Sequence, residues 1–240
     1  TYLDRRTVEA RRLEQALDTE LASLEENFPD EPRAKLAALE VRLDRIAAQE
    51  SDEKEQRRKM RALVGEEVPV VQAFLNAPTG SFDGQDLLRL NNTLARIGVP
   101  NQYETMNEII ERVPGDEIDP RVVVLHAEVL GGMGQYDESI AILQDSLAEP
   151  IRPLSLDGLV QRYFRPQTLM RLADQALAKW ETSENESEKA EALALAKDAQ
   201  RQLNETTQGG EQSAEALSVT GKLAMAEERH AEAVRVFTEL

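Results

Sequence analysis

Apolar residues recur every three or four positions along most of this chain, and this period constrains the fold more than any other feature. The first stripe consists of Leu13, Leu17, Leu21, Leu24 and Phe28. Such spacing places all five side chains on one face of an α-helix, so we expect a helix over residues 3–27. The segment 27–32 then ends it, because each of its prolines disfavours helix at the preceding residue.

A second stripe follows at once. It consists of Leu36, Leu39, Leu43 and Ile46. Two amphipathic helices joined by a short turn are expected to fold back as an antiparallel hairpin. Residues 49–59 contain no apolar side chain, which indicates either a solvated helix or a break near Ser51 and Asp52. The short apolar segment 68–78 is expected to pack where the hairpin meets the rest of the chain.

The composition agrees with these periods and predicts an all-α fold. Ala, Leu, Glu, Arg and Gln dominate, and these residues lose little on entering a helix. Aromatic residues make up only 4%, and the few prolines and glycines cluster at short breaks. The chain has no cysteine, which excludes disulfides and thiolate chemistry.

The pattern changes after a loop at 79–84, where we place a domain boundary between residues 1–78 and 79–240. Beyond it, shorter helices are expected in pairs. The pairs are 85–97 with 101–113, 120–132 with 136–148, 166–180 with 188–203, and 213–227 with 231–240. The acidic stretch 181–188 is expected to join the third pair. Residues 149–166, which include Tyr163 and Phe164, are expected to form a loop with one short helical turn.

Small residues recur at fixed distances within these pairs. Ala127 is followed 12 residues later by Ser139 and 16 residues later by Leu143. Gly221 is followed at the same distances by Ala233 and Phe237. Helices approach closely only where the facing side chains are small, so Ala127 and Ala233 are expected to be buried at helix contacts. Gly134 is expected to supply the left-handed conformation that ends the first helix of its pair.

This pattern resembles the tetratricopeptide repeat family, whose unit is a 34-residue helical hairpin. The matching residues are Ala127, Leu130, Gly134, Tyr136, Ser139, Leu143 and Pro150 in one unit, and Leu217, Gly221, Ala224, Ala233 and Phe237 in the last. The resemblance covers residues 85–240 and implies an α-α superhelix whose last unit is truncated. The chain departs from the family at Glu228, which stands where a corner glycine belongs, and in the acidic stretch.

The resemblance also implies a groove lined by the first helix of each pair. The residues that follow the small packing residues would face this groove. They are Asn92, Glu128, Asp174 and Lys222, with Arg89 and Arg96 one turn to either side of Asn92. The family's clamp for a peptide carboxylate uses Lys, Asn and Arg in adjacent units, whereas this chain has acids in its next two units. We therefore expect a protein or peptide partner near the basic cluster around Asn92.

Several other functions are not expected. A net charge of -17 disfavours binding to nucleic-acid phosphates, and no apolar run approaches the roughly 20 residues of a membrane span. The two histidines, His126 and His230, are too few and too far apart to make a metal site. Neither a nucleophile-elbow motif nor a phosphate-binding loop occurs. We expect no catalytic activity, cofactor or metal.

The sequence therefore favours a non-catalytic scaffold that binds a partner protein or peptide. One alternative is a structural module that forms a homodimer through residues 1–64, and another is an accessory region of a larger multidomain protein. The chain starts at Thr1 and stops at Leu240 within a helical pattern, which indicates a fragment or a processed chain. Its compartment stays open between the cytoplasm and the soluble part of a membrane-anchored bacterial protein.

Overall fold

The computed structural model describes residues 2–78, 80–113, 119–148, 156–206 and 213–240. Over these ranges the chain forms helices and no strand, which confirms the all-α prediction. The helices fall into two compact units, Thr1–Pro114 and Gly115–Leu240.

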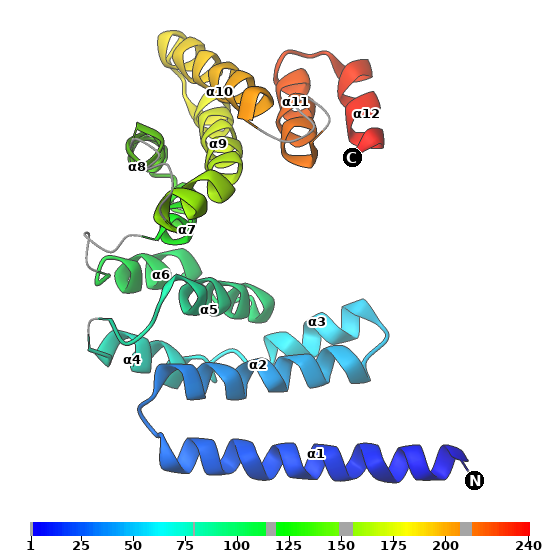
Figure 1. The fold of residues 1–240 in the computed structure, drawn as a ribbon. Coiled ribbons are helices and arrows are strands. Elements are labelled where there is room, and N and C mark those ends of the chain that lie inside the picture. Colours follow the sequence, from blue (N-terminus) through cyan, green and yellow to red (C-terminus); the bar gives the residue numbers. More distant parts are fainter. Residues whose placement is uncertain (1, 79, 114–118, 149–155, 207–212) are drawn as a thin grey trace. The chain divides into compact units, whose positions relative to one another are not determined.

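The first unit begins with the expected antiparallel hairpin. Its helices are α1 (Tyr2–Asn27), α2 (Pro32–Gln49), α3 (Glu53–Arg61), α4 (Val68–Asn76), α5 (Gly84–Ile97) and α6 (Gln102–Ile110). Figure 1 shows α1 and α2 running in opposite directions. Arg45, late in α2, forms an ion pair of 2.5 Å with Asp18 in α1, as this antiparallel arrangement requires.

The charged stretch after α2 contains a break rather than a continuous helix. α2 ends at Gln49, and Asp52 caps the start of α3 by accepting a hydrogen bond of 2.9 Å from the backbone N–H of Lys54. A capping carboxylate satisfies one of the N–H groups that the first helical turn leaves unpaired. Of the two alternatives for residues 49–59, the structure selects the break near Ser51 and Asp52.

The core of this unit lies where α2 contacts α4 and α5. Its largest fully buried side chains include Leu36, Leu43, Phe74, Leu87, Leu90 and Leu94. α5 also packs against α3, and α4 against α6, so the helices after the loop at 79–84 share one core with the hairpin. For this reason the compact units divide after Pro114, whereas the change in pattern that suggested a boundary at residue 79 lies inside the first unit.

In the ranges that the structure describes, the second unit forms three helix pairs. They are α7 (Pro120–Gly132) with α8 (Tyr136–Ala148), α9 (Leu156–Thr182) with α10 (Glu186–Thr206), and α11 (Ala214–Ala226) with α12 (His230–Glu239). Contacts also join the first helices of successive pairs, α7 with α9 and α9 with α11. The bounds of α7 and α8 are those that the sequence predicts.

The small residues lie where their spacing places them. Ala127 and Ala233 are fully buried, as predicted. The buried Ser139 hydroxyl donates a hydrogen bond of 2.8 Å to the carbonyl oxygen of Ala127, so α8 lies directly on the backbone of α7. In the last pair a Cβ atom on Gly221 would lie 2.6 Å from the Phe237 ring, so this contact needs a glycine or a shift of the ring. Pro150 lies outside the described residues.

Several corners between the described helices use a residue with positive φ. Gly98 and Gly134 have φ angles of 76° and 78°, and the predicted role of Gly134 is thereby confirmed. Glu228 has a φ angle of 58° at the corner between α11 and α12. Asn101, at the start of α6, has a φ angle of 59°. A left-handed conformation costs a residue with a Cβ atom roughly 1–2 kcal/mol, so the corners at Asn101 and Glu228 carry a strain that a glycine avoids.

Two predictions for α9 and its connections are wrong. Residues 156–166, expected in a loop, belong to α9, which continues through Pro166. Residues 149–155 lie outside the described ranges. Arg165 donates a hydrogen bond of 3.1 Å to the carbonyl of Leu147, and this contact holds the early part of α9 against the end of α8. Tyr163 and Phe164 are therefore helical residues with their rings 5.1 Å apart.

The connection between α9 and α10 is also shorter than the acidic stretch 181–188 that was expected to form it. α9 reaches Thr182 and α10 starts at Glu186, so three residues join them. The side-chain oxygen of Asn185 accepts a hydrogen bond of 2.9 Å from the N–H of Ser187 and caps α10. Glu186 and Glu188 lie in the first turn of α10, where the helix dipole favours negative charge. Their acidity therefore supports the start of a helix.

Candidate functional site

Charged side chains link the first helices of the pairs in the second unit. Glu128 of α7 forms an ion pair of 2.7 Å with Arg171 of α9. Asp174, one turn further along α9, forms an ion pair of 2.6 Å with Lys222 of α11. These four residues lie on the first helix, or A helix, of each pair, and we call them the A-helix face. Three of them are site residues that the sequence predicts, and the structure brings them onto adjoining helices.

Arg171 is the member of this face that sequence reasoning missed. It lies three residues before Asp174 on the same helix, at a spacing that puts both side chains on one face. No local pattern relates it to Glu128, which is 43 residues earlier in the chain. Its place in the site depends on the packing of α9 against α7.

The predicted basic cluster of the first unit is not an isolated positive patch. Arg89 binds Glu40 through two hydrogen bonds, of 2.5 and 3.1 Å. Arg96 forms an ion pair of 2.8 Å with Asp44. Both acids belong to α2, which packs beside α5 and neutralises the two guanidinium groups. The positive charge of this cluster is therefore compensated within the first unit.

Asn92 differs from its two neighbours on α5. Its side chain is exposed and makes no hydrogen bond with any residue that the structure describes. An amide group can donate to a peptide carbonyl and accept from a peptide N–H at the same time. Of the three predicted residues on this helix, Asn92 is the one whose polar atoms stay available to a ligand.

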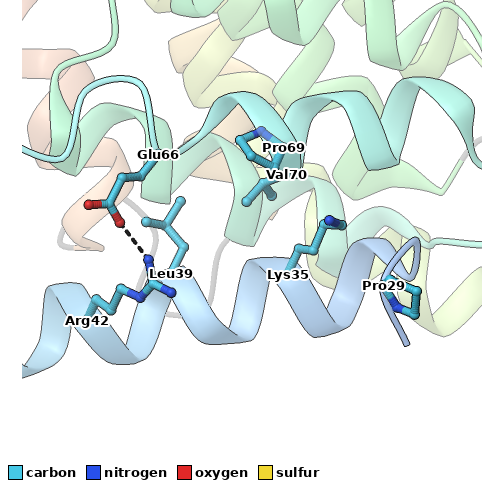
Figure 2. A pocket seen from close by; sticks show the side chains of 7 residues that line it. All are labelled: Pro29, Lys35, Leu39, Arg42, Glu66, Pro69 and Val70. Carbon is cyan, nitrogen blue, oxygen red and sulfur yellow. Dashed lines mark hydrogen bonds and ion pairs between the residues drawn. The ribbon is translucent and has the colours of Figure 1, made fainter. Parts of the chain in front are cut away.

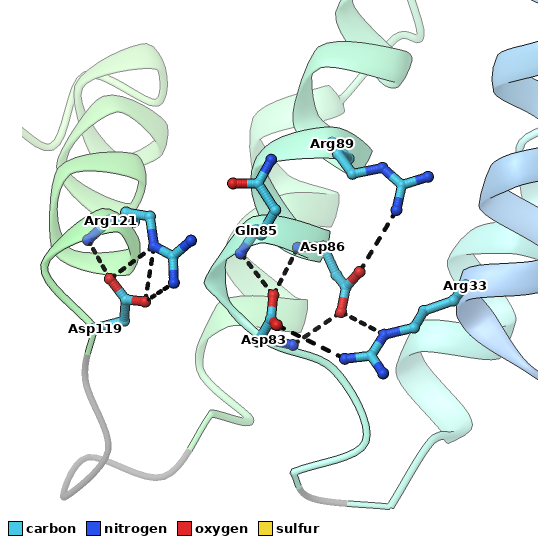
Figure 3. A network of polar contacts seen from close by, with 7 residues as sticks. All are labelled: Arg33, Asp83, Gln85, Asp86, Arg89, Asp119 and Arg121. Atoms are coloured by element: carbon cyan, nitrogen blue, oxygen red, sulfur yellow. Dashed lines mark hydrogen bonds and ion pairs between the residues drawn. The ribbon is translucent and has the colours of Figure 1, made fainter.

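A more buried network begins at the N-terminus of α5 (Figure 3). The Asp86 carboxylate, only 6% exposed, accepts a hydrogen bond of 2.7 Å from Nε of Arg33 on α2. The same carboxylate accepts from the backbone N–H of Asp83, whose own side chain accepts from the N–H groups of Gln85 and Asp86. This reciprocal capping box fixes the start of α5. The hydrogen bond to Asp86 is also the main reason that the pKa of Arg33 lies above its usual value.

These ion pairs differ in what they contribute. Partly exposed pairs such as Asp174 with Lys222 contribute about 0–1 kcal/mol each, because water and salt screen them. Breaking the pair of the buried Asp86 would cost more stability, because loss of Arg33 would leave a carboxylate with little access to water. The pairs therefore help to fix which residues of neighbouring helices lie opposite each other. They also neutralise side chains that could otherwise bind a charged ligand.

A pocket of about 370 Å³ opens between α2 and α4 of the first unit (Figure 2). Leu39 of α2 and Val70 of α4 line it, together with Pro29 and Pro69. Its polar lining consists of the side chains of Lys35, Arg42 and Glu66. In Figure 2 the Lys35, Leu39 and Arg42 side chains extend from α2 towards α4. Sequence reasoning did not find this pocket, because its walls come from two segments, 29–42 and 66–70, that are distant in the chain.

The described residues contain no group of three or more histidines and carboxylates arranged to hold a metal ion. Of the helices in the described ranges, none is both long and apolar enough to cross a membrane. The described residues offer ion pairing, amide hydrogen bonding and contact with the pocket between α2 and α4.

Comparisons with protein-family models, curated proteins and solved structures found no match to this chain.

Proposed function

We propose that this chain is a non-catalytic scaffold that binds a partner protein or peptide on a tetratricopeptide-like array of helix pairs. The observation that carries the proposal is the side-by-side packing of α7, α9 and α11 in successive pairs, joined by the A-helix face. Arrays that stack one hairpin on the next bury a continuous core and leave an extended surface along the first helices. Such a surface suits an extended peptide.

Ion-paired residues make this proposal testable without unfolding the chain. In one variant Asp174→Lys is combined with Lys222→Asp, which keeps an opposite-charge pair but exchanges the two charges. Glu128→Arg with Arg171→Glu is the matching exchange between α7 and α9. Each double variant should melt close to the parent, because the pair is preserved. Binding of the partner should weaken, because the charge pattern that it meets is inverted.

The experiment starts with capture of partners by the full chain from a cell extract and their identification by mass spectrometry. A purified partner is then titrated against the parent, both exchange variants and Asn92→Ala. Weaker binding in any of these variants, with an unchanged circular dichroism spectrum, supports the proposal. Unchanged affinity in all of them would place the partner elsewhere, and failure to find any partner would argue against a scaffold.

A second candidate function is self-association through α1. Among the described residues α1 contacts α2 and no other helix, and its stripe leaves Leu17 41% exposed. Phe28, directly after α1, is 54% exposed. A second copy of the hairpin could cover these side chains, as the homodimer alternative for residues 1–64 requires. Light scattering of the parent and of Leu17→Glu separates the two: a dimer that dissociates in the variant favours this function.

A further inference from the structure

The pocket between α2 and α4 carries a positive charge that nothing in the described chain neutralises. Of its two cationic side chains, Arg42 forms an ion pair of 2.6 Å with Glu66 across the pocket (Figure 2). Lys35 makes no ion pair and no side-chain hydrogen bond with any described residue. The pocket therefore holds two cations and one carboxylate, with the Lys35 ammonium as the group that has donors to offer.

The remaining lining is apolar and poor in hydrogen-bonding groups. Leu39 and Val70 form buried walls, and the rings of Pro29 and Pro69 carry no N–H donor. Such a surface can contact an aliphatic side chain of a ligand, and a hydrogen bond from Lys35 would fix the orientation of that ligand. Pockets of a few hundred Å³ with apolar walls and one or two placed polar groups are typical ligand sites.

Exposed apolar residues lie next to this pocket in the sequence. Phe28 precedes Pro29 and is 54% exposed, and Val68 precedes Pro69 and is 51% exposed. Large apolar side chains that are exposed to water in two segments beside the same pocket are typical of an interaction site. They extend the apolar surface beyond the pocket itself.

We propose that this pocket binds a short acidic segment of a partner protein. One aliphatic side chain of the segment contacts Leu39 and Val70, and a neighbouring carboxylate accepts a hydrogen bond from the Lys35 ammonium. This inference rests on the proposed interaction function, and it names a ligand class and a site separate from the A-helix face. Charge complementarity favours an acidic ligand, because two cations and one carboxylate line the pocket although the whole chain has a net charge of -17.

The acidity of the whole chain does not oppose this binding at physiological salt. Charges further apart than about 8 Å are largely screened in 0.15 M salt, so distant carboxylates contribute little to the potential in the pocket. The ammonium group of Lys35 is within contact distance of a ligand that enters the pocket, where screening is weakest. Binding should therefore weaken only gradually as salt is raised above this level.

Three acetylated pentapeptides test the proposal directly. The first has one leucine between two pairs of glutamates, the second has serine in place of the leucine, and the third has lysines in place of the glutamates. Each is titrated into the full ¹⁵N-labelled chain and followed by NMR. We expect the first peptide to shift the amide signals of Lys35, Leu39 and Val70, and the other two to bind about fivefold or more weakly.

Charge reversal provides the matched control. Lys35→Glu should weaken the first peptide about fivefold or more, whereas Lys54→Glu, an equal charge change on the exposed surface of α3, should not. Equal effects of the two variants, equal binding of the leucine and serine peptides, or signal shifts away from α2 and α4 would each overturn the proposal. If a captured partner binds Lys35→Glu and the parent equally, the pocket proposal fails while the scaffold function stands.

Discussion

Gly131→Ala tests the close approach of α7 and α9. Gly131 lies in the last turn of α7, and a Cβ atom built on it would lie 2.6 Å from Cδ of Gln175 and closer still to its amide oxygen. Gln175 is only 7% exposed, so its amide cannot swing freely into water. The structure records no hydrogen bond to that oxygen, so moving it breaks none. The cost of the substitution is therefore steric.

The expected magnitude follows from two opposing effects. Alanine is favoured over glycine in a helix interior by about 1 kcal/mol, which is an upper limit for the last turn, where Gly131 lies. Forcing an extra methyl group into a packed contact costs typically about 1–3 kcal/mol. Taking about 2 kcal/mol for the clash and subtracting the helix preference, we expect Gly131→Ala to lower the free energy of unfolding by about 1 kcal/mol. Urea denaturation followed by circular dichroism measures this difference.

Gly132→Ala is the matched control, because Gly132 belongs to the same helix but is exposed. It should be neutral or stabilise the chain by up to about 1 kcal/mol. Adding Gln175→Ala to Gly131→Ala should recover part of the loss by removing the clashing amide. A Gly131→Ala variant as stable as the parent or more stable would show that α7 and α9 do not approach as closely as described.

Three further predictions concern a strained corner, a packing position and a helix cap. Glu228→Gly should raise the free energy of unfolding by about 1 kcal/mol in urea titrations, because glycine adopts a positive φ without strain; a loss would refute the strain. Ala233→Leu should lower the melting temperature through about 1–3 kcal/mol of overpacking, whereas Leu at the exposed Ala231 should not. Burial raises the pKa of Asp119, but hydrogen bonds from Arg121 outweigh this effect and hold the pKa below its usual value (Figure 3). The ionised Asp119 therefore stabilises the fold fully above about pH 4, and this stabilisation is lost as the pH falls through the lowered pKa. Asp119→Asn should therefore flatten the decline of stability in acid, and an unchanged acid titration would contradict this.

Local sequence was sufficient for most helices of the fold. The stripes at spacing three and four predicted α1, α2, α7 and α8 closely, because a helix forms from residues that are near one another in the chain. The contact between Ala127 and Ser139 was also predictable, since a short corner leaves two consecutive helices little choice but to pack together. Gly134 marked that corner correctly.

Local patterns failed where a residue's role depends on a distant segment. Gly131 and Gly134 are alike in the sequence, yet Gly134 supplies a left-handed turn and Gly131 makes room for Gln175 of α9. The prolines around Tyr163 suggested a loop, but α9 passes through Pro166. A proline inside a helix removes one backbone hydrogen bond and costs about 3 kcal/mol, which tertiary packing can offset and a local pattern cannot reveal.

The charged residues show the same division most clearly. The sequence determined that Arg89 and Arg96 share a face of one helix, because that follows from their spacing. Only the tertiary structure decided that this face meets Glu40 and Asp44 of α2, which lie 49 and 52 residues earlier, and so carries no free positive charge. It likewise left Lys35 without an ion-pair partner among the described residues, in the lining of the pocket between α2 and α4. Helical periodicity fixes which side chains point the same way, whereas the packing of helices distant in the chain fixes which charges they meet.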